Sequence, residues 1–126
     1  MENESVAKSG GEEPAVLDVT GMLARMGGKK ELAGRMAQIY QRLHPEQIRV
    51  LRRVVAEGDA EALRLQAHTI KGGAGNVGGL ALHAMAVQME ERAKAGRLEE
   101  ARGLMPALER ESARLLEALK TEFGAP

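Results

Sequence analysis

Residues 59–78 of the chain read DAEALRLQAHTIKGGAGNVG, and this stretch holds the most regular helical pattern in the sequence. Asp59 is a residue type that often caps the N-terminus of a helix. After it, small and aliphatic side chains recur at intervals of three and four residues: Ala60, Leu63, Ala67, Ile70 and Ala74. This spacing places the apolar side chains on one face of an α-helix. We therefore predict a helix that follows Asp59, ends in the glycine-rich run and buries this face.

A second helical pattern precedes this stretch. Its apolar residues are Leu32, Met36, Ile39 and Leu43, and then, beyond a proline, Ile48, Leu51 and Val55. Pro45 removes a backbone donor from the helix, so we expect a break or kink at His44 and Pro45. Gly58 then supplies a helix stop. Further upstream, a short helix should begin at Asp18 and end at the glycine pair 27–28.

Two more helical patterns follow the glycine-rich run. The first contains Leu80, Leu82, Met85, Ala86, Met89 and Ala93, and the second contains Leu98, Ala101, Met105, Leu108, Leu115, Leu116, Leu119 and Phe123. Pro106 should bend the last helix or mark its start. No strand pattern competes with these stripes. The sequence thus predicts an all-α fold, an antiparallel up-and-down four-helix bundle with a short extra N-terminal helix and a kink near Pro45.

Composition limits the function classes. The 126 residues fit one domain, which we place at residues 15–126 after a disordered acidic tail at 1–14. The chain has no cysteine, which excludes disulfides and thiol chemistry, and no apolar run that could span a membrane or act as a signal peptide. Eighteen basic residues balance 18 acidic ones, and only two are aromatic, so nucleic acid is a poor partner. We expect a soluble, cytoplasmic protein.

Several motifs that carry chemistry can be set aside. Residues 73–78 (GAGNVG) match the dinucleotide fingerprint G-x-G-x-x-G, but they follow a helix, whereas that motif needs a preceding strand. The three histidines, His44, His68 and His83, lack metal-ligand spacing, so we predict no metal site. No serine lies near a histidine in the sequence, so no nucleophile and base pair is predicted.

His68 is the remaining candidate. On a helical wheel it lies roughly 120° from the core face, so its side chain should reach solvent. Arg64, Lys71, Gly72 and Gly75 fall on the same side of the helix. A neutral imidazole has a lone pair that can attack phosphorus, and a lysine beside it can neutralise phosphoryl oxygens. The alternative is that His68 is an ordinary solvated surface residue.

The run 67–78 (AHTIKGGAGNVG) resembles the signature of histidine-containing phosphotransfer (HPt) domains, A-H-x-[LI]-K-G followed by a small pair and G-x-[LIV]-G. Three further matches extend the resemblance. Gly58 and Asp59 match the family's Gly-Asp cap, Met89 and Glu90 match its apolar-Glu pair, and LDVTGMLARMGGKKEL (17–32) resembles its first short helix. About 110 residues are covered in all.

The resemblance implies a protein that carries a phosphoryl group between receiver-domain aspartates and has no catalytic activity of its own. It implies phosphorylation of His68, support by Lys71 and clearance for the receiver's loops at Gly72 and Gly75. A further docking surface would include two residues, Arg64 and Met22. No cofactor would be bound, because the receiver supplies Mg²⁺. Glu90 stands where some members have a Gln near the histidine, and its role is left open.

The expected partners are response-regulator receiver domains, with a hybrid histidine kinase as a further candidate. We expect a monomer, since no heptad pattern demands a dimer. Two alternatives stay open. One is the N-terminal phosphotransfer domain of a chemotaxis-type histidine kinase, and the other is a helical adaptor that docks receivers without accepting phosphate.

Overall fold

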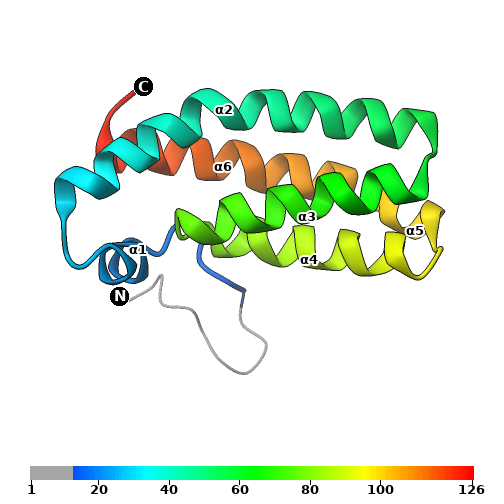
Figure 1. The fold of residues 1–126 in the computed structure, drawn as a ribbon, viewed down its shortest axis with the longest axis horizontal. Coiled ribbons are helices and arrows are strands. Elements are labelled where there is room, and N and C mark those ends of the chain that lie inside the picture. The colour runs from blue at the N-terminus through cyan, green and yellow to red at the C-terminus, as the bar shows by residue number, and fades with distance from the viewer. Residues whose placement is uncertain (1–12) are drawn as a thin grey trace.

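The computed structural model describes residues 13–126, and within them the chain forms six helices and no strand (Figure 1). Their bounds are α1 Val19–Arg25, α2 Lys30–Glu57, α3 Ala60–Asn76, α4 Leu80–Lys94, α5 Leu98–Gly103 and α6 Met105–Phe123. The predicted acidic tail at 1–14 lies almost wholly outside the described residues. In the part of the chain that is described, no helix has the length and apolar character needed to cross a bilayer.

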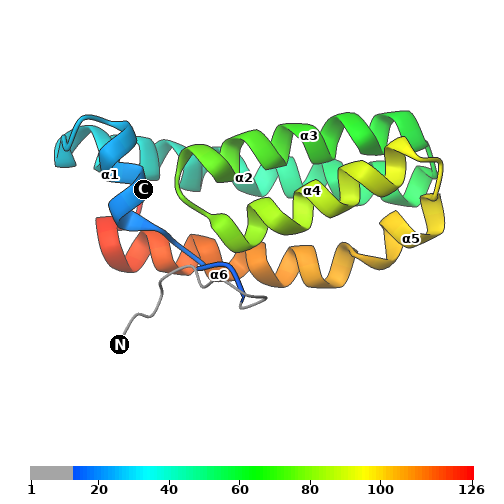
Figure 2. The same ribbon diagram turned by 90° about the horizontal axis from the view of Figure 1, so that it is seen from below.

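The four long helices, α2, α3, α4 and α6, form the predicted up-and-down bundle (Figures 1 and 2). α3 packs between α2 and α4, and α6 closes the bundle by packing against the same two helices. The largest fully buried aliphatic side chains come from all of these helices and from α1: Met22, Leu51, Leu63, Ile70, Leu82, Met89, Leu108, Leu115 and Leu119. The core is therefore aliphatic, as the composition requires.

Of the break or kink predicted at Pro45, the break is absent, because α2 is one helix of 28 residues with the proline inside it. Figure 1 shows its first turns sloping away from the axis of the remainder. A proline inside a helix costs about 3 kcal/mol through its lost hydrogen bond and steric conflict. Here the residues on both sides of it, His44 and Ile48, are buried. Tertiary packing thus outweighs the local preference of the proline.

The continuity of α2 also overturns the predicted core stripe in its first half. Leu32, Ile39 and Leu43 are exposed. The buried side chains of this segment are instead Ala33, Ala37, Tyr40, Gln41 and His44. An unbroken helix must keep one buried face, and steps of three and four residues backward from Ile48 lead to this second set. A break at Pro45 would have allowed the face to change there.

Local turn chemistry follows the sequence closely. Gly58 ends α2 with a left-handed backbone, φ 74°, and the side chain of Asp59 caps α3 by accepting bonds from two backbone N–H groups. Pro106 lies in the first turn of α6 and marks its start, which is one of the two predicted alternatives. At the other end of the bundle, the Asp18 N–H donates to the Gly78 carbonyl over 2.7 Å. This bond attaches α1 to the turn between α3 and α4.

A buried polar cluster joins α2 to α6. His44 is fully buried, its Nδ1 lies 3.0 Å from Gln47 Oε1, and its Nε2 lies 2.6 Å from Ser112 Oγ. Its ring also stacks on Tyr40, with 4.8 Å between ring centres. Because the Gln47 oxygen can only accept, Nδ1 donates and Nε2 accepts from the serine hydroxyl. The structure therefore forms a serine–histidine pair that sequence separation concealed, and it lies in the core.

This arrangement predicts that folding stability depends on the protonation of His44. Burial lowers the pKa of His44, and the hydrogen bond to Gln47 only partly opposes this effect. As pH falls below about 6.5, unfolded His44 takes up a proton that native His44 does not, so the free energy of unfolding should fall. Urea denaturation across this pH range measures the effect.

In a His44→Gln variant, this component of the pH dependence should be missing, even if the variant is less stable at every pH. Its free energy of unfolding should therefore vary less between about pH 6.5 and 5 than that of the original protein. Equal slopes in the two proteins would contradict the proposed contribution of His44.

Candidate functional site

His68 lies on the outer surface of α3, and its side chain is 60% exposed. α3 packs against α4, and its core-facing side carries small and aliphatic residues that are fully buried, among them Ala67, Ile70 and Ala74. Ala86 and Met89 of α4 are equally buried and belong to the same core cluster. The small side chains let the two helices approach closely. Glu90, which follows Met89, is thereby brought to the edge of the α3–α4 interface beside His68.

The Glu90 carboxylate bridges two residues of α3. One oxygen, Oε2, lies 2.8 Å from His68 Nδ1, and the other, Oε1, lies 2.7 Å from Lys71 Nζ. Glu90 is 14% exposed and Lys71 28% exposed, so the bridge is largely sheltered from solvent. Because an ionised carboxylate can only accept, His68 donates through Nδ1–H. In the neutral imidazole, Nε2 then keeps a free lone pair.

The neighbouring Lys71 ammonium group keeps the Glu90 carboxyl group ionised. The hydrogen bond from the Lys71 ammonium group holds the pKa of the Glu90 carboxyl below its ordinary value, and the bond from His68 acts in the same direction. Burial opposes both effects but does not cancel them. Glu90 is thus a carboxylate at neutral pH. A negative group of this kind fixes the orientation and tautomer of the imidazole that it binds.

The glycines of this segment differ in what surrounds them. A Cβ atom at Gly72 would meet nothing within 4 Å, so this position beside His68 is open. A Cβ atom at Gly75 would lie 3.3 Å from His83 Nδ1, and one at Gly73 would lie 3.3 Å from the Tyr40 ring. Gly72 therefore has the geometry that the predicted clearance requires. Gly75 instead makes room for a side chain of α4, which corrects its predicted role.

The two predicted docking residues differ in their exposure to solvent. Arg64 lies one helical turn before His68 with its side chain 29% exposed, and it forms an ion pair with Glu61. It therefore remains available on the histidine face. Met22 is fully buried, because α1 folds over the end of the bundle and inserts this side chain into the core. Met22 is thus excluded from any docking surface.

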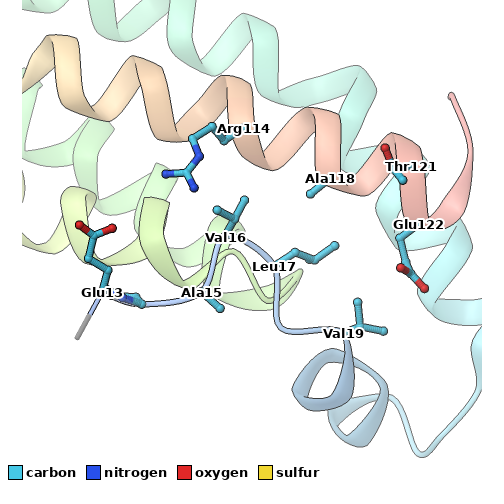
Figure 3. Close-up of a pocket in the computed structure, with 10 residues that line it drawn as sticks. Glu13, Ala15, Val16, Leu17, Val19, Arg114, Ala118, Thr121 and Glu122 are labelled. Atoms are coloured by element: carbon cyan, nitrogen blue, oxygen red, sulfur yellow. The ribbon is translucent and has the colours of Figure 1, made fainter. Parts of the chain in front are cut away.

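The groove between the N-terminal segment and α6 lies away from His68. A groove of about 690 Å³ separates the extended segment before α1 from α6 (Figure 3). Its lining includes Val16, Leu17, Arg114 and Thr121, but none of the residues around His68. Within residues 13–126, no three His, Asp or Glu side chains are placed to hold a metal ion. His68 itself is an exposed group on a helix, which a partner surface can reach.

Most of the chain matches one known protein family. Residues 35–122 match the family model described as the Hpt domain, and this range includes His68, Lys71 and Glu90. The chain belongs to the Hpt domain family. It is therefore a histidine-containing phosphotransfer domain of two-component phosphorelay signalling, a class of protein whose partners are receiver domains and kinases.

A solved structure supports this assignment. The Hpt domain is similar to histidine-containing phosphotransfer protein B (HptB) from Pseudomonas aeruginosa PAO1, with a TM-score of 0.78 and 30% sequence identity. The similarity covers 86% of this chain and 94% of that one. No curated protein matches the chain.

The surroundings of the glycines predict contrasting effects on stability. Gly72→Ala should be neutral or stabilise the domain by up to about 1 kcal/mol, because alanine is the better helix former and its methyl group meets nothing. Gly78 has φ +80°, and a Cβ atom there would lie 2.6 Å from the Asp18 carbonyl oxygen. Gly78→Ala should therefore destabilise the domain by at least about 2 kcal/mol.

Urea denaturation of the two variants tests this contrast, and each serves as the control for the other. A loss of stability in Gly72→Ala as large as that in Gly78→Ala would show that position 72 is not open in solution.

Proposed function

We propose that this Hpt domain accepts a phosphoryl group on His68 from the aspartate of one receiver domain and passes it to the aspartate of another. The observation that carries the proposal is the exposed imidazole whose Nδ1 is bound by Glu90 and whose Nε2 is free. The open backbone at Gly72 supports it, because a partner's loops must come within bonding distance of that nitrogen.

The chemistry requires one nucleophilic nitrogen. The Nε2 lone pair forms a bond to phosphorus while the bond from phosphorus to the aspartyl oxygen breaks, and the electron pair returns to the aspartate. The ring gains positive charge in this step, and the Glu90 carboxylate offsets that charge through Nδ1–H. Lys71, one turn further along α3, adds positive charge for the phosphoryl oxygens. Transfer to the second receiver is the same step in reverse.

The partner supplies what the domain lacks. The receiver would bring the Mg²⁺ that neutralises the phosphoryl group, and this chain would act as a carrier without catalytic activity of its own. We place the relay in the cytoplasm and the carrier as a monomer, with a hybrid histidine kinase as a further source of a receiver. Phosphorylation by a kinase domain with ATP, without any receiver, would favour the chemotaxis-type alternative.

Exposed apolar side chains on α2 and α3 support docking of a protein partner. Among residues 13–126, the exposed large hydrophobic side chains are Leu32, Ile39, Leu43 and Leu65. Leu65 lies one turn before His68 on α3. Leu43 lies one turn before Gln47 on α2, and the Gln47 backbone carbonyl accepts a 2.9 Å bond from Gln66 of α3. Apolar surface of this kind, next to a reactive group, is typical of interaction sites.

The first experiment identifies the phosphorylated residue. Incubation with a phosphorylated receiver and Mg²⁺ should give an acid-labile, base-stable label, and His68→Gln should abolish it while the circular dichroism spectrum keeps its helical content. Label that persists in this variant, or that maps to a peptide containing His44 or His83, would refute the assignment. Receiver binding by a wild-type protein that never becomes labelled would favour the adaptor alternative.

The second experiment tests the apolar surface. Leu65→Lys should raise the receiver concentration needed for half-maximal transfer by at least about fivefold, because a lost leucine contact is worth up to about 1.5–3 kcal/mol and a lysine resists desolvation. The transfer rate at saturation should change little. Ala113→Lys, which adds the same charge at an exposed site on α6, is the control. Equal responses in the two variants would argue against docking at Leu65.

A further inference from the structure

His83 is a conspicuous residue of α4 that the phosphotransfer chemistry does not use. Its Nδ1 lies 3.1 Å from the backbone carbonyl oxygen of Lys71, and a carbonyl oxygen can only accept, so His83 donates this bond. The ring occupies the space left by the missing side chain of Gly75. A bond from an α4 side chain to the α3 backbone fixes the position of α4 along the axis of α3.

The same face of α4 carries Glu90. His83 and Glu90 are seven residues apart, which is two turns, or about 10 Å along the helix, and they differ by only about 20° around it. Both contact Lys71. His83 binds its backbone carbonyl, and Glu90 binds its ammonium group while also reaching His68. Lys71 is therefore held at its backbone and at the end of its side chain by two residues of one helix.

We infer that His83 is a positioning residue for phosphotransfer: by bonding the Lys71 carbonyl in the space at Gly75, it sets α4 in the register that brings Glu90 to His68 Nδ1. The expected effect of His83 on transfer rests on the proposed function of His68. Its expected effect on the unphosphorylated imidazole does not depend on that function. A shift of α4 along the helix axis would move the Glu90 carboxylate relative to His68 Nδ1 and weaken their bond, because a hydrogen bond depends on both distance and angle.

Gly75 and His83 depend on each other, because the His83 ring fills the space beside Gly75. An alanine at position 75 would place its Cβ 3.3 Å from Nδ1 and 3.6 Å from Cε1 of His83, so the ring would have to move. Gly75→Ala and His83→Leu should therefore disturb Glu90 in the same way. Once the His83 donor has been removed, the further change at position 75 should add little, which is the non-additivity expected of contacting residues.

The test uses an isosteric pair of substitutions. Asparagine places an amide N–H donor near the position of the His83 Nδ1–H, whereas leucine has a similar shape and no donor. ¹⁵N NMR of the unphosphorylated protein reads the fraction of His68 in the Nδ1–H tautomer. Stopped reactions with a phosphorylated receiver read the transfer rate.

His83→Leu should lower the Nδ1–H fraction of His68 and slow transfer by about fivefold, the loss that corresponds to one hydrogen bond of about 1 kcal/mol. His83→Asn should retain most of the Nδ1–H fraction of His68 and most of the transfer rate. Arg25→Ala is a matched control for the tautomer, because Arg25 of α1 donates a 3.0 Å bond to the Gly75 carbonyl in the same turn of α3. It should leave the His68 tautomer unchanged.

An unchanged His68 tautomer in His83→Leu would overturn the inference, as would equal losses in the Leu and Asn variants. If His83→Leu fails to fold, Gly75→Ala provides the same comparison, and an unchanged tautomer there overturns the inference as well. Failure of the proposed function looks different: no phosphoryl group would reach His68 in any of these proteins, while the tautomer would still respond to His83→Leu.

Discussion

The Glu90 carboxylate, held between His68 and Lys71, is the contact on which the site depends. A histidine on the outside of a helix is ordinarily free to rotate and to exchange between tautomers. Here one carboxylate oxygen accepts from Nδ1–H, and the other is bound by a lysine that keeps the group ionised. The ring is therefore oriented while most of its surface stays in solvent. Orientation and exposure together are what a phosphoryl carrier needs.

The rest of the bundle can be understood as the support of this contact. Buried alanines on α3 and α4 let the two helices pack closely enough for Glu90 to cross between them. Beside His68, α3 has one open glycine, Gly72, and one exposed leucine, Leu65, a turn before the histidine. The histidine thus has the charged groups of Glu90 and Lys71 on one side and an apolar side chain one turn before it on α3.

Much of this could be predicted from the sequence, because it depends on local patterns. Periodicity located the helices, and Gly58, Asp59 and Pro106 marked their ends correctly. The exposed position of His68 followed from the helical wheel. The errors arose where tertiary packing decides: α2 continues through Pro45, so its buried face is the one that contains Ala37 and His44 and not the one that contains Ile39. Met22 failed as a docking residue for the same reason, since α1 folds inward.

The contacts between helices could not be predicted from spacing alone. Glu90 lies 22 residues after His68, His83 lies 15 after it, and Ser112 lies 68 after His44, so their pairing depends on how the helices are aligned. The family resemblance placed Glu90 near the histidine but left its role open. The alignment of α3 with α4 gives that role.

The central claim is that Glu90 occupies Nδ1 and leaves Nε2 as the nucleophile. Long-range ¹H–¹⁵N correlation spectra of the phosphorylated protein distinguish the two ring nitrogens directly, because the nitrogen bonded to phosphorus changes its chemical shift and couples to phosphorus. We expect phosphorus on Nε2 of His68, with Nδ1 still protonated and bound to Glu90. Phosphorus on Nδ1, or an Nδ1 that has lost its proton, would contradict it.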